Sequence, residues 1–217
     1  MTSAVDGPAR AGHLVLRPCG EAGWLLDLDD NRSVHRWAAA VRAAGLPGVA
    51  EVVPGFTTLL VTVDPAATTP AALRAALLDL TPSSDASAEG DHHVIDVCYD
   101  GEDIDDVAAM TGLSPAEVVA AHTGTPWRVA FCGFAPGFSY LVGGDPRLEV
   151  PRRDEARVRV PAGSVAIAGE FSSIYPRASP GGWRLLGRTD ATLWSSEADP
   201  PAVLLPGDVV EFRDVTA

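Results

Sequence analysis

The most informative absence in this sequence is lysine, because all sixteen of its basic residues are arginines. Without lysine the chain cannot supply the phosphate-binding lysine of a P-loop, the Schiff base of a pyridoxal enzyme or a biotinylated carrier site. The GxGxxG pattern of dinucleotide-binding folds is missing as well. A nucleotide that binds this chain would therefore bind without a standard nucleotide fold.

Cysteine and long apolar runs are also scarce. Only Cys19, Cys98 and Cys132 are present, far apart and without CxxC spacing, so we expect reduced thiols and no metal site. No apolar run approaches the roughly 20 residues that span a bilayer, and no signal-peptide pattern opens the chain. We therefore expect a cytoplasmic protein without a membrane partner. The formal net charge of −13 argues against nucleic acid as a partner.

Basic charge is concentrated in one part of this acidic chain. Residues 128–188 hold nine arginines against five carboxylates. Guanidinium groups bind carboxylates and phosphates through paired hydrogen bonds, so the pattern favours an anionic ligand. The alternative is that some of these arginines only pair with neighbouring acids.

The same part of the chain contains a loop rich in glycine, proline and aromatic residues, Gly133–Tyr140 (GFAPGFSY). Glycine and proline restrict the backbone to shapes that other residues do not fit. The loop could present backbone N–H groups to an oxyanion or a phosphate, with its aromatic side chains as the walls of a pocket. The alternative is a tight barrel corner with its aromatic residues in the core.

Several side chains could perform chemistry around this loop. His122 lies at the end of a predicted helix, where it could act as a general acid–base group or only cap the helix dipole. Glu170 could orient a polar substrate, or it could pair with an arginine. We predict catalytic roles for His122, Arg159 and Glu170. We predict substrate-binding roles for Gly133, Phe134, Pro136, Gly137, Tyr140, Arg152, Arg153, Ser164, Tyr175 and Trp183.

Hydrophobic periodicity predicts an α+β protein with two domains. Residues 1–11 are expected to form a loose tail at the start of a first domain, 1–88. Within that domain, short strands alternate with a helix over 31–44 and a second helix that begins at Thr69-Pro70. This pattern is typical of a small two-layer α/β domain.

The polar stretch 81–91 predicts a linker between this domain and a second one, 89–217. Ser114–Glu117 has the residue pattern of a helix capping box, with proline at the first helical position. From 127 to 215, short strands alternate with Gly/Pro turns, and 203–212 is expected to form a strand–turn–strand. These features predict a β-barrel with helical insertions.

Several segments of the chain resemble the family called allophanate hydrolase subunit 1. The resemblance covers roughly residues 13–213 and depends most on GFAPGF (133–138) and SPGGW (179–183). It also includes RVRVPAGSVAIAG and LLPGDVVEF. The sequence departs from the family at Glu170–Ser173, where Gln-Thr-Gly is frequent, and at Ser139, where proline is common. These departures bear on the substrate rather than on the fold.

The resemblance implies a small α/β domain followed by a cyclophilin-like barrel, and a partner subunit of related barrel fold. The same family contains a subunit of the ATP-dependent 5-oxoprolinase and an inhibitor of a sporulation histidine kinase. It therefore implies a heteromeric enzyme that uses ATP, with or without Mg²⁺, to hydrolyse a small amide or lactam, most simply 5-oxoproline to glutamate. ATP would be bound by the complex rather than by this chain alone, and no covalent cofactor is expected. The alternatives are a regulator that inhibits a histidine kinase and a carboxyltransferase-like part of a urea or amide carboxylase.

Overall fold

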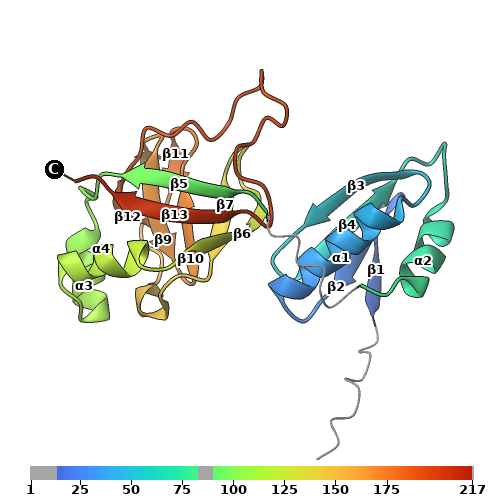
Figure 1. Cartoon of the computed structure of the whole chain (residues 1–217), viewed down its shortest axis with the longest axis horizontal. Coiled ribbons are helices and arrows are strands. Elements are labelled where there is room, and N and C mark those ends of the chain that lie inside the picture. The colour runs from blue at the N-terminus through green and yellow to red at the C-terminus, as the bar shows by residue number, and fades with distance from the viewer. Residues whose placement is uncertain (1–13, 83–89, 217) are drawn as a thin grey trace, which may run out of the picture. The chain divides into compact units, whose positions relative to one another are not determined.

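The computed structural model describes residues 14–82 and 90–216, which form two compact units (Figure 1). The first unit comprises residues 14–53 and 57–82, and the second comprises 54–56 and 90–216. The predicted tail, 1–11, and the predicted domain boundary at 88/89 both lie outside the described residues.

The first unit is a two-layer α/β structure, as predicted. Its sheet has the strand order β1-β2-β4-β3, formed by β1 (Val15–Cys19), β2 (Gly23–Asp27), β4 (Thr58–Val63) and β3 (Val49–Pro54). Two helices, α1 (Asn31–Ala44) and α2 (Pro70–Asp79), pack on it. Alternate residues of β4, Leu59, Val61 and Val63, are buried because successive side chains of a strand point to opposite faces. They form one core with Val34 and Leu77 of the helices.

Local sequence determines where these helices begin and end. The Asp30 carboxylate accepts a hydrogen bond from the Ser33 backbone N–H at 2.6 Å and so caps α1. Gly45 ends α1 with φ 54°, a left-handed conformation that glycine adopts without steric cost. Thr69 caps α2 in the same way, and Pro70 occupies its first turn.

The second unit is a seven-stranded barrel that is almost closed. Its strand order is β12-β9-β10-β7-β6-β13-β5, formed by β12 (Arg184–Arg188), β9 (Ser164–Ala168), β10 (Phe171–Ile174), β7 (Ser139–Val142), β6 (Trp127–Cys132), β13 (Val209–Asp214) and β5 (His92–Val97). The end strands β12 and β5 are joined through Cys98 and Arg188, whose backbone groups exchange two hydrogen bonds of 2.9 Å. The barrel encloses an apolar core that includes Val129, Leu141 and Ile167.

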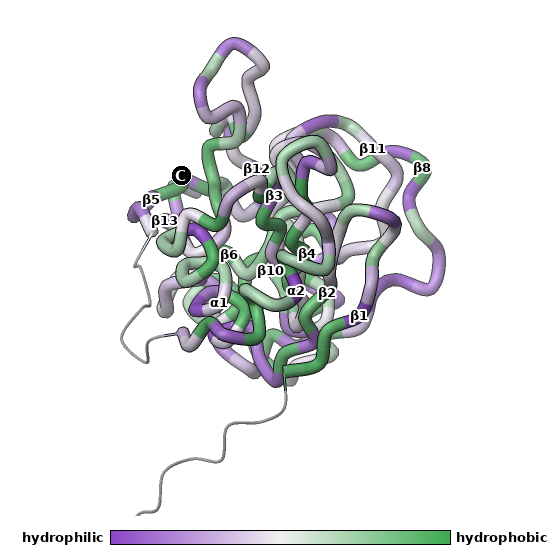
Figure 2. The backbone as a smooth tube through the Cα atoms, turned by 90° about the vertical axis from the view of Figure 1, so that its right-hand side faces the viewer, coloured by the Kyte–Doolittle hydropathy of each residue, from purple (hydrophilic) through white to green (hydrophobic). Residues whose placement is uncertain are grey.

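Smaller elements complete the barrel unit. The helices α3 (Ile104–Thr111) and α4 (Pro115–Thr123) lie together at one end of it (Figure 1). A short 3-10 helix, η1 (Pro146–Leu148), follows β7, and β8 (Arg157–Val160) pairs with β11 (Ser179–Gly181) in a two-stranded ribbon. The loop around β8 has hydrophilic colour in Figure 2, in keeping with its arginines. None of the helices within the described residues is both long enough and apolar enough to cross a membrane.

The strand–turn–strand prediction for 203–212 is only half right. The turn is present, since the Asp208 N–H donates to the Leu205 carbonyl at 3.0 Å, and β13 follows it. Residues before the turn form no strand; Val203 makes one backbone bond to Leu193 instead. β13 pairs in parallel with β5, from the other end of the domain. A local hydrophobic pattern does not indicate a partner so far away in sequence.

The capping box of α4 allows a direct test of helix stability. Ser114 Oγ accepts from the Glu117 N–H, and the Glu117 carboxylate accepts from the Ser114 N–H at 2.8 Å. We expect Ser114→Ala to lower the free energy of unfolding by about 1 kcal/mol, because the Glu117 N–H loses its acceptor and the Glu117 carboxylate loses the bond from Ser114 Oγ. Urea unfolding measures this, with Ser196→Ala, an exposed loop serine, as the control. Equal losses in the two variants would contradict the assignment.

Candidate functional site

The Gly133–Tyr140 loop joins β6 to β7 through two consecutive tight turns. Phe134 has φ 67°, and the N–H of Ala135 donates to the carbonyl of Gly133 at 2.7 Å, which closes a γ-turn around Phe134. The N–H of Phe138 donates to the carbonyl of Ala135 at 3.0 Å, and Gly137 has φ 78°, as the third residue of a type II β-turn requires. A Cβ at Gly137 would also lie 2.8 Å from Trp194 Cβ. Sterics therefore select glycine at this position.

Phe134 combines an unfavourable backbone conformation with an exposed aromatic side chain. A positive φ costs a bulky residue about 1–3 kcal/mol and persists only where the surrounding structure imposes it. The side chain is nevertheless 63% exposed, so it recovers little of this energy by burial. Strain of this kind concentrates at functional sites.

Phe134 lies at the edge of a small pocket with a volume of about 90 Å³. The pocket joins the GFAPGF loop to the SPGGW segment, and its lining residues are Phe134, Phe138, Tyr140, Arg152, Tyr175, Pro180, Gly181, Gly182 and Trp183. We call it the aromatic pocket. The aromatic rings of its walls pack edge to face. The centre of the Phe138 ring lies 5.3 Å from that of the Tyr175 ring and 5.6 Å from that of the Trp183 ring.

The polar groups of the aromatic pocket are a guanidinium and two phenols. Arg152 places its guanidinium carbon 5.9 Å from the centre of the Trp183 ring. Burial raises the pKa of Tyr175, partly offset by a hydrogen bond from the Trp183 backbone. Tyr175 is therefore an uncharged phenol at neutral pH, and Arg152 is the only charged residue among those that line the pocket.

A buried serine hydroxyl lies on the same face of the sheet as the aromatic rings. Ser173 pairs with Ala166, and both side chains point to the side where Phe171, Tyr140 and Tyr175 lie. Ser173 has no exposed surface, and its Oγ has no hydrogen-bond partner among the described residues. The sequence prediction did not include Ser173, although it lies in the Glu170–Ser173 stretch that departs from the family pattern.

The segment that carries Arg152 is held by the buried carboxylate of Asp103. Arg153 Nη1 and Arg157 Nη2 donate to Asp103 Oδ1 at 2.6 and 2.8 Å, and the Leu185 N–H donates to Oδ2 at 2.7 Å. Burial acts to raise the pKa of Asp103, but these hydrogen bonds outweigh it and hold the pKa below its usual value. The Arg153 N–H also donates to the Gly182 carbonyl at 2.8 Å, which connects this cluster to the pocket.

The structure brings five of the predicted substrate-binding residues together and separates the others. Phe134, Tyr140, Arg152, Tyr175 and Trp183 line the aromatic pocket. Gly133, Pro136 and Gly137 shape its loop, Arg153 pairs with Asp103, and Ser164 is buried at the start of β9. Pro180, Gly181 and Gly182 of the pocket were not predicted, although the SPGGW motif pointed to that segment.

Two of the predicted catalytic residues lie away from the pocket wall. Arg159 is exposed on β8. Glu170 lines a separate depression of about 210 Å³ beside Trp127 and Phe171. Five of the nine arginines between 128 and 188 pair with carboxylates, namely Arg147, Arg153, Arg157, Arg184 and Arg188. The arginines therefore do not converge on one site, and the alternative that they pair with acids holds for most of them.

His122 lies in the barrel core rather than at the pocket. Its Nδ1 lies 2.7 Å from the Tyr99 hydroxyl and its Nε2 lies 2.8 Å from Ser172 Oγ. Ser172 can donate its own proton to the Ala166 carbonyl, 3.4 Å away, so a neutral His122 with its proton on Nε2 satisfies the whole chain of hydrogen bonds. Burial lowers the pKa of His122 to about 3. The geometry therefore gives no support to an acid–base role and indicates a structural one.

Comparison with known proteins gives the family. A model of the carboxyltransferase domain, subdomains C and D, matches residues 14–204. This chain belongs to that family. Two relatives that are named as a subunit of 5-oxoprolinase are similar to it: the Bacillus subtilis (strain 168) protein is 36% identical over 84% of this chain and 82% of its own length. The Escherichia coli O157:H7 protein is 38% identical over 89% of this chain and 92% of its own length.

Solved structures show the same fold. TTHA0988 matches with a TM-score of 0.78 at 34% identity, over 94% of this chain, which spans only 40% of that longer protein. PH0987 from Pyrococcus horikoshii matches over 93% of this chain and 98% of its own, with 35% identity and a TM-score of 0.57. The Kluyveromyces lactis urea carboxylase matches 94% of this chain and 22% of its own length, with 21% identity and a TM-score of 0.72. At this low identity the likeness concerns the fold alone.

The pKa of His122 predicts a specific pH dependence of stability. In the unfolded state His122 has a pKa of about 6.5 and binds a proton below that pH, whereas in the folded state it stays neutral. The stability of the protein therefore falls as pH falls. Between pH 7.5 and pH 5.0 the free energy of unfolding is expected to fall by about 2 kcal/mol from this proton uptake. We expect the stability difference between the wild type and His122→Asn to shrink by about this amount over that range, in urea unfolding. A difference that does not vary with pH would contradict a buried neutral histidine.

The aromatic pocket depends on Gly181. A Cβ at Gly181 would lie 2.2 Å from the Tyr175 hydroxyl oxygen, whereas a Cβ at Gly182 would meet nothing closer than 3.7 Å. We expect Gly181→Ala to lower the free energy of unfolding by about 1–3 kcal/mol, because Tyr175 is only 2% exposed and its ring packs against Phe138, so the ring cannot move aside freely. Gly182→Ala is the matched control and should cost much less. Similar losses of unfolding free energy from the two substitutions, measured by urea unfolding, would show that the Tyr175 ring can shift at little cost.

Proposed function

We propose that this chain is one subunit of a heteromeric complex that opens a small lactam with ATP, and that 5-oxoproline is the substrate. Three curated relatives at 36–41% identity are named as a subunit of 5-oxoprolinase, which supports this assignment. The name also supports assembly with further subunits. In this proposal the chain contributes the aromatic pocket as a binding site for the substrate.

The observation that favours this substrate is the position of Arg152 over Trp183 at an otherwise uncharged aromatic pocket. A guanidinium pairs well with a carboxylate, and the aromatic walls suit a small, partly apolar ring. 5-Oxoproline has both features, a carboxylate on a five-membered lactam. Its carboxylate would pair with Arg152, and its ring would lie against Trp183 and Phe134. The exposed Phe134 side chain could then exclude water from the bound lactam.

ATP, in this proposal, is bound elsewhere in the complex. The aromatic pocket has about 90 Å³, well below the roughly 300 Å³ at which pockets for larger ligands begin. Activation of an unstrained lactam by phosphorylation of its oxygen requires cations close to the transferred phosphoryl group. Arg159 is exposed on β8, the strand that follows the Arg152 segment, and could extend toward a nucleotide bound by a partner. The Mg²⁺ that accompanies ATP would be held on the partner side.

A carboxyltransferase role is the second candidate, because the family model describes a carboxyltransferase domain. The two functions differ in what the complex consumes. A carboxyltransferase needs a biotinylated carrier, which another chain must supply because this one has no lysine. Activity that depends on added biotin carboxylase and carrier protein, rather than on ATP and 5-oxoproline alone, would favour this second function. Inhibition of a histidine kinase, the other alternative from the sequence, stays an untested prediction.

The proposal predicts how Arg152 affects the kinetics of the assembled complex. We expect ATP-dependent release of glutamate from 5-oxoproline, and we expect Arg152→Met to raise KM by about 10- to 100-fold with a smaller change in kcat. Loss of one charge-assisted hydrogen bond to a carboxylate costs about 1.5–3 kcal/mol of binding.

Arg147→Met is the matched control, because Arg147 pairs with Asp145 at the surface and does not line the aromatic pocket. Its KM should equal that of the wild type. Intact complexes that release no glutamate above background would refute the proposed activity. A normal KM for Arg152→Met would refute the role given to the aromatic pocket.

A further inference from the structure

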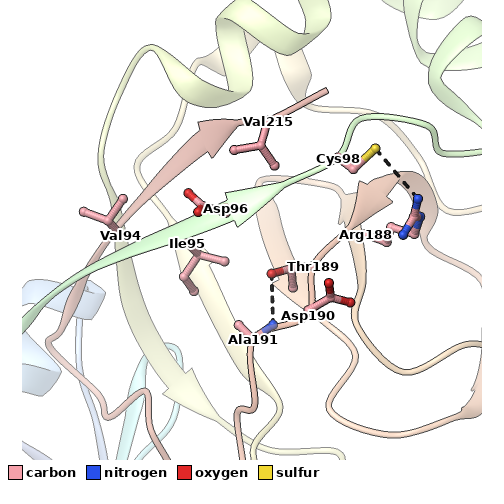
Figure 3. Close-up of a pocket in the computed structure, with 9 residues that line it drawn as sticks. All are labelled: Val94, Ile95, Asp96, Cys98, Arg188, Thr189, Asp190, Ala191 and Val215. Carbon is pink, nitrogen blue, oxygen red and sulfur yellow. Dashed lines mark hydrogen bonds between the residues drawn. The ribbon is translucent and has the colours of Figure 1, made fainter. Parts of the chain in front are cut away.

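The barrel has an open seam between its two end strands. Beyond the contact of Cys98 with Arg188, no strand of the described residues pairs with the outer edge of β5. A depression of about 530 Å³ occupies this gap. Figure 3 shows β5 on one side of it, Thr189–Ala191 on the other, and the Cys98–Arg188 contact at one end. We call this depression the seam.

Backbone hydrogen-bonding groups of β5 point into the seam at alternate residues. The carbonyls of Asp91 and Val97 accept bonds from Val209 and Val215, so the odd-numbered residues of β5 face β13. The N–H of Cys98 donates instead to Arg188, on the opposite edge. By alternation, the N–H and C=O groups of Val94 and Asp96 face the seam. Both residues line it.

The opposite wall of the seam does not complete this ladder. After Arg188 the chain turns away, because the N–H of Thr189 donates to the Gly163 carbonyl at 2.9 Å and that of Ala191 donates to Thr189 Oγ1 at 3.2 Å. The gap is therefore closed at Cys98 and open toward Val94, whose side chain is 53% exposed. Unpaired groups on an exposed strand edge are a template for an added strand.

We propose that the seam receives one extended strand of the second subunit, which pairs with β5 and completes the barrel wall. This inference rests on the heteromeric complex proposed above, and it names the surface through which this chain assembles. Strand addition of this kind obtains affinity from backbone bonds and specificity from alternate side chains.

Charge around the seam favours a basic strand over a second copy of this chain. Two carboxylates, Asp96 and Asp190, line the seam against one guanidinium, Arg188; Asp96 also pairs with Arg213, and Arg188 pairs with Asp100. Antiparallel pairing of β5 with its own copy would bring Asp96 close to the same residue across the junction, and like charges on facing strands are destabilising. The net charge of −13 adds to that repulsion.

The side-chain pattern of the incoming strand follows from the walls. Ile95, only 5% exposed, lines the inner side of the seam, whereas Asp96 lies on the outer side. The strand should therefore alternate apolar residues, which contact Ile95, with lysine or arginine, which lie beside Asp96 and the exposed carboxylate of Asp190.

Amide hydrogen exchange, resolved by residue, tests this assignment. This chain is compared alone and in complex with the co-expressed second subunit of the same 5-oxoprolinase. We expect the amides of Val94 and Asp96 to exchange fast in the isolated chain and at least about 100-fold more slowly in the complex, because strand pairing protects them. The amides of Ile95 and Val97 should be slow in both samples. Protection of Val94 and Asp96 already in the isolated chain would mean that the seam is filled without a partner, and it would overturn the proposal.

A pair of variants gives a second test. Val94→Pro removes an N–H that faces the seam and leaves the β5–β13 bonds intact, whereas Val94→Ala keeps that N–H. We expect the proline variant to bind the second subunit at least about tenfold more weakly than the alanine variant, in a surface-binding assay, with an unchanged unfolding midpoint. Equal binding by the two variants, or no binding by the wild type, would overturn the proposal. If Val94→Pro lowers the unfolding midpoint, Asp96→Lys replaces it, and repulsion of a basic strand should weaken binding by a similar factor.

These results can be separated from a failure of the proposed function. Complexes that assemble through another surface and still release glutamate would refute the seam alone. Complexes that assemble through the seam but release no glutamate would refute the activity alone.

Discussion

One buried carboxylate supports the architecture on which the candidate site depends. Asp103 is 1% exposed, and it accepts hydrogen bonds from Arg153, Arg157 and the Leu185 N–H. It thus ties the start of α3 to the segment that carries Arg152 and to the strand that follows Trp183. Removal of one partner of a buried ion pair is strongly destabilising, since it leaves an uncompensated charge. Arg157 also pairs with Glu102 at 3.2 Å, whereas two further donors of the cluster, Arg153 Nε and Arg157 Nη1, have no partner among the described residues.

This arrangement explains how an acidic chain can offer one cationic group to a ligand. Most arginines of the barrel are held by carboxylates, and these ion pairs fasten one segment of the unit to another. Arg152 is different, because its guanidinium lies over the face of the Trp183 ring. The strained γ-turn at Phe134 and the glycine at 181 place rigid walls around that guanidinium. The pocket and the seam lie on different parts of the barrel, so substrate binding and assembly can be tested separately.

Local sequence signals predicted much of this structure, but they could not predict contacts between residues that are far apart in the sequence. The helix over 31–44 and the capping box at Ser114 were correct, because caps depend on neighbouring residues. Five of the residues predicted to bind substrate do meet at one pocket, among them Phe134 of the GFAPGF motif and Trp183 of the SPGGW motif. The partner of Arg153 could not be predicted, since Asp103 is 50 residues away and only packing of α3 against β12 brings them together. The same limit applies to His122, whose burial depends on the closure of the barrel around it.

The central claim is that Arg152 and Trp183 together bind the carboxylate and ring of a small lactam. It is tested most directly by NMR titration of the assembled complex while the indole N–H signals of the five tryptophans are followed. We predict that 5-oxoproline shifts the Trp183 signal saturably, and that 2-pyrrolidinone, which lacks the carboxylate, binds at least about tenfold more weakly. A Trp183 signal that does not move at saturating 5-oxoproline, or that responds equally to both lactams, would contradict the account.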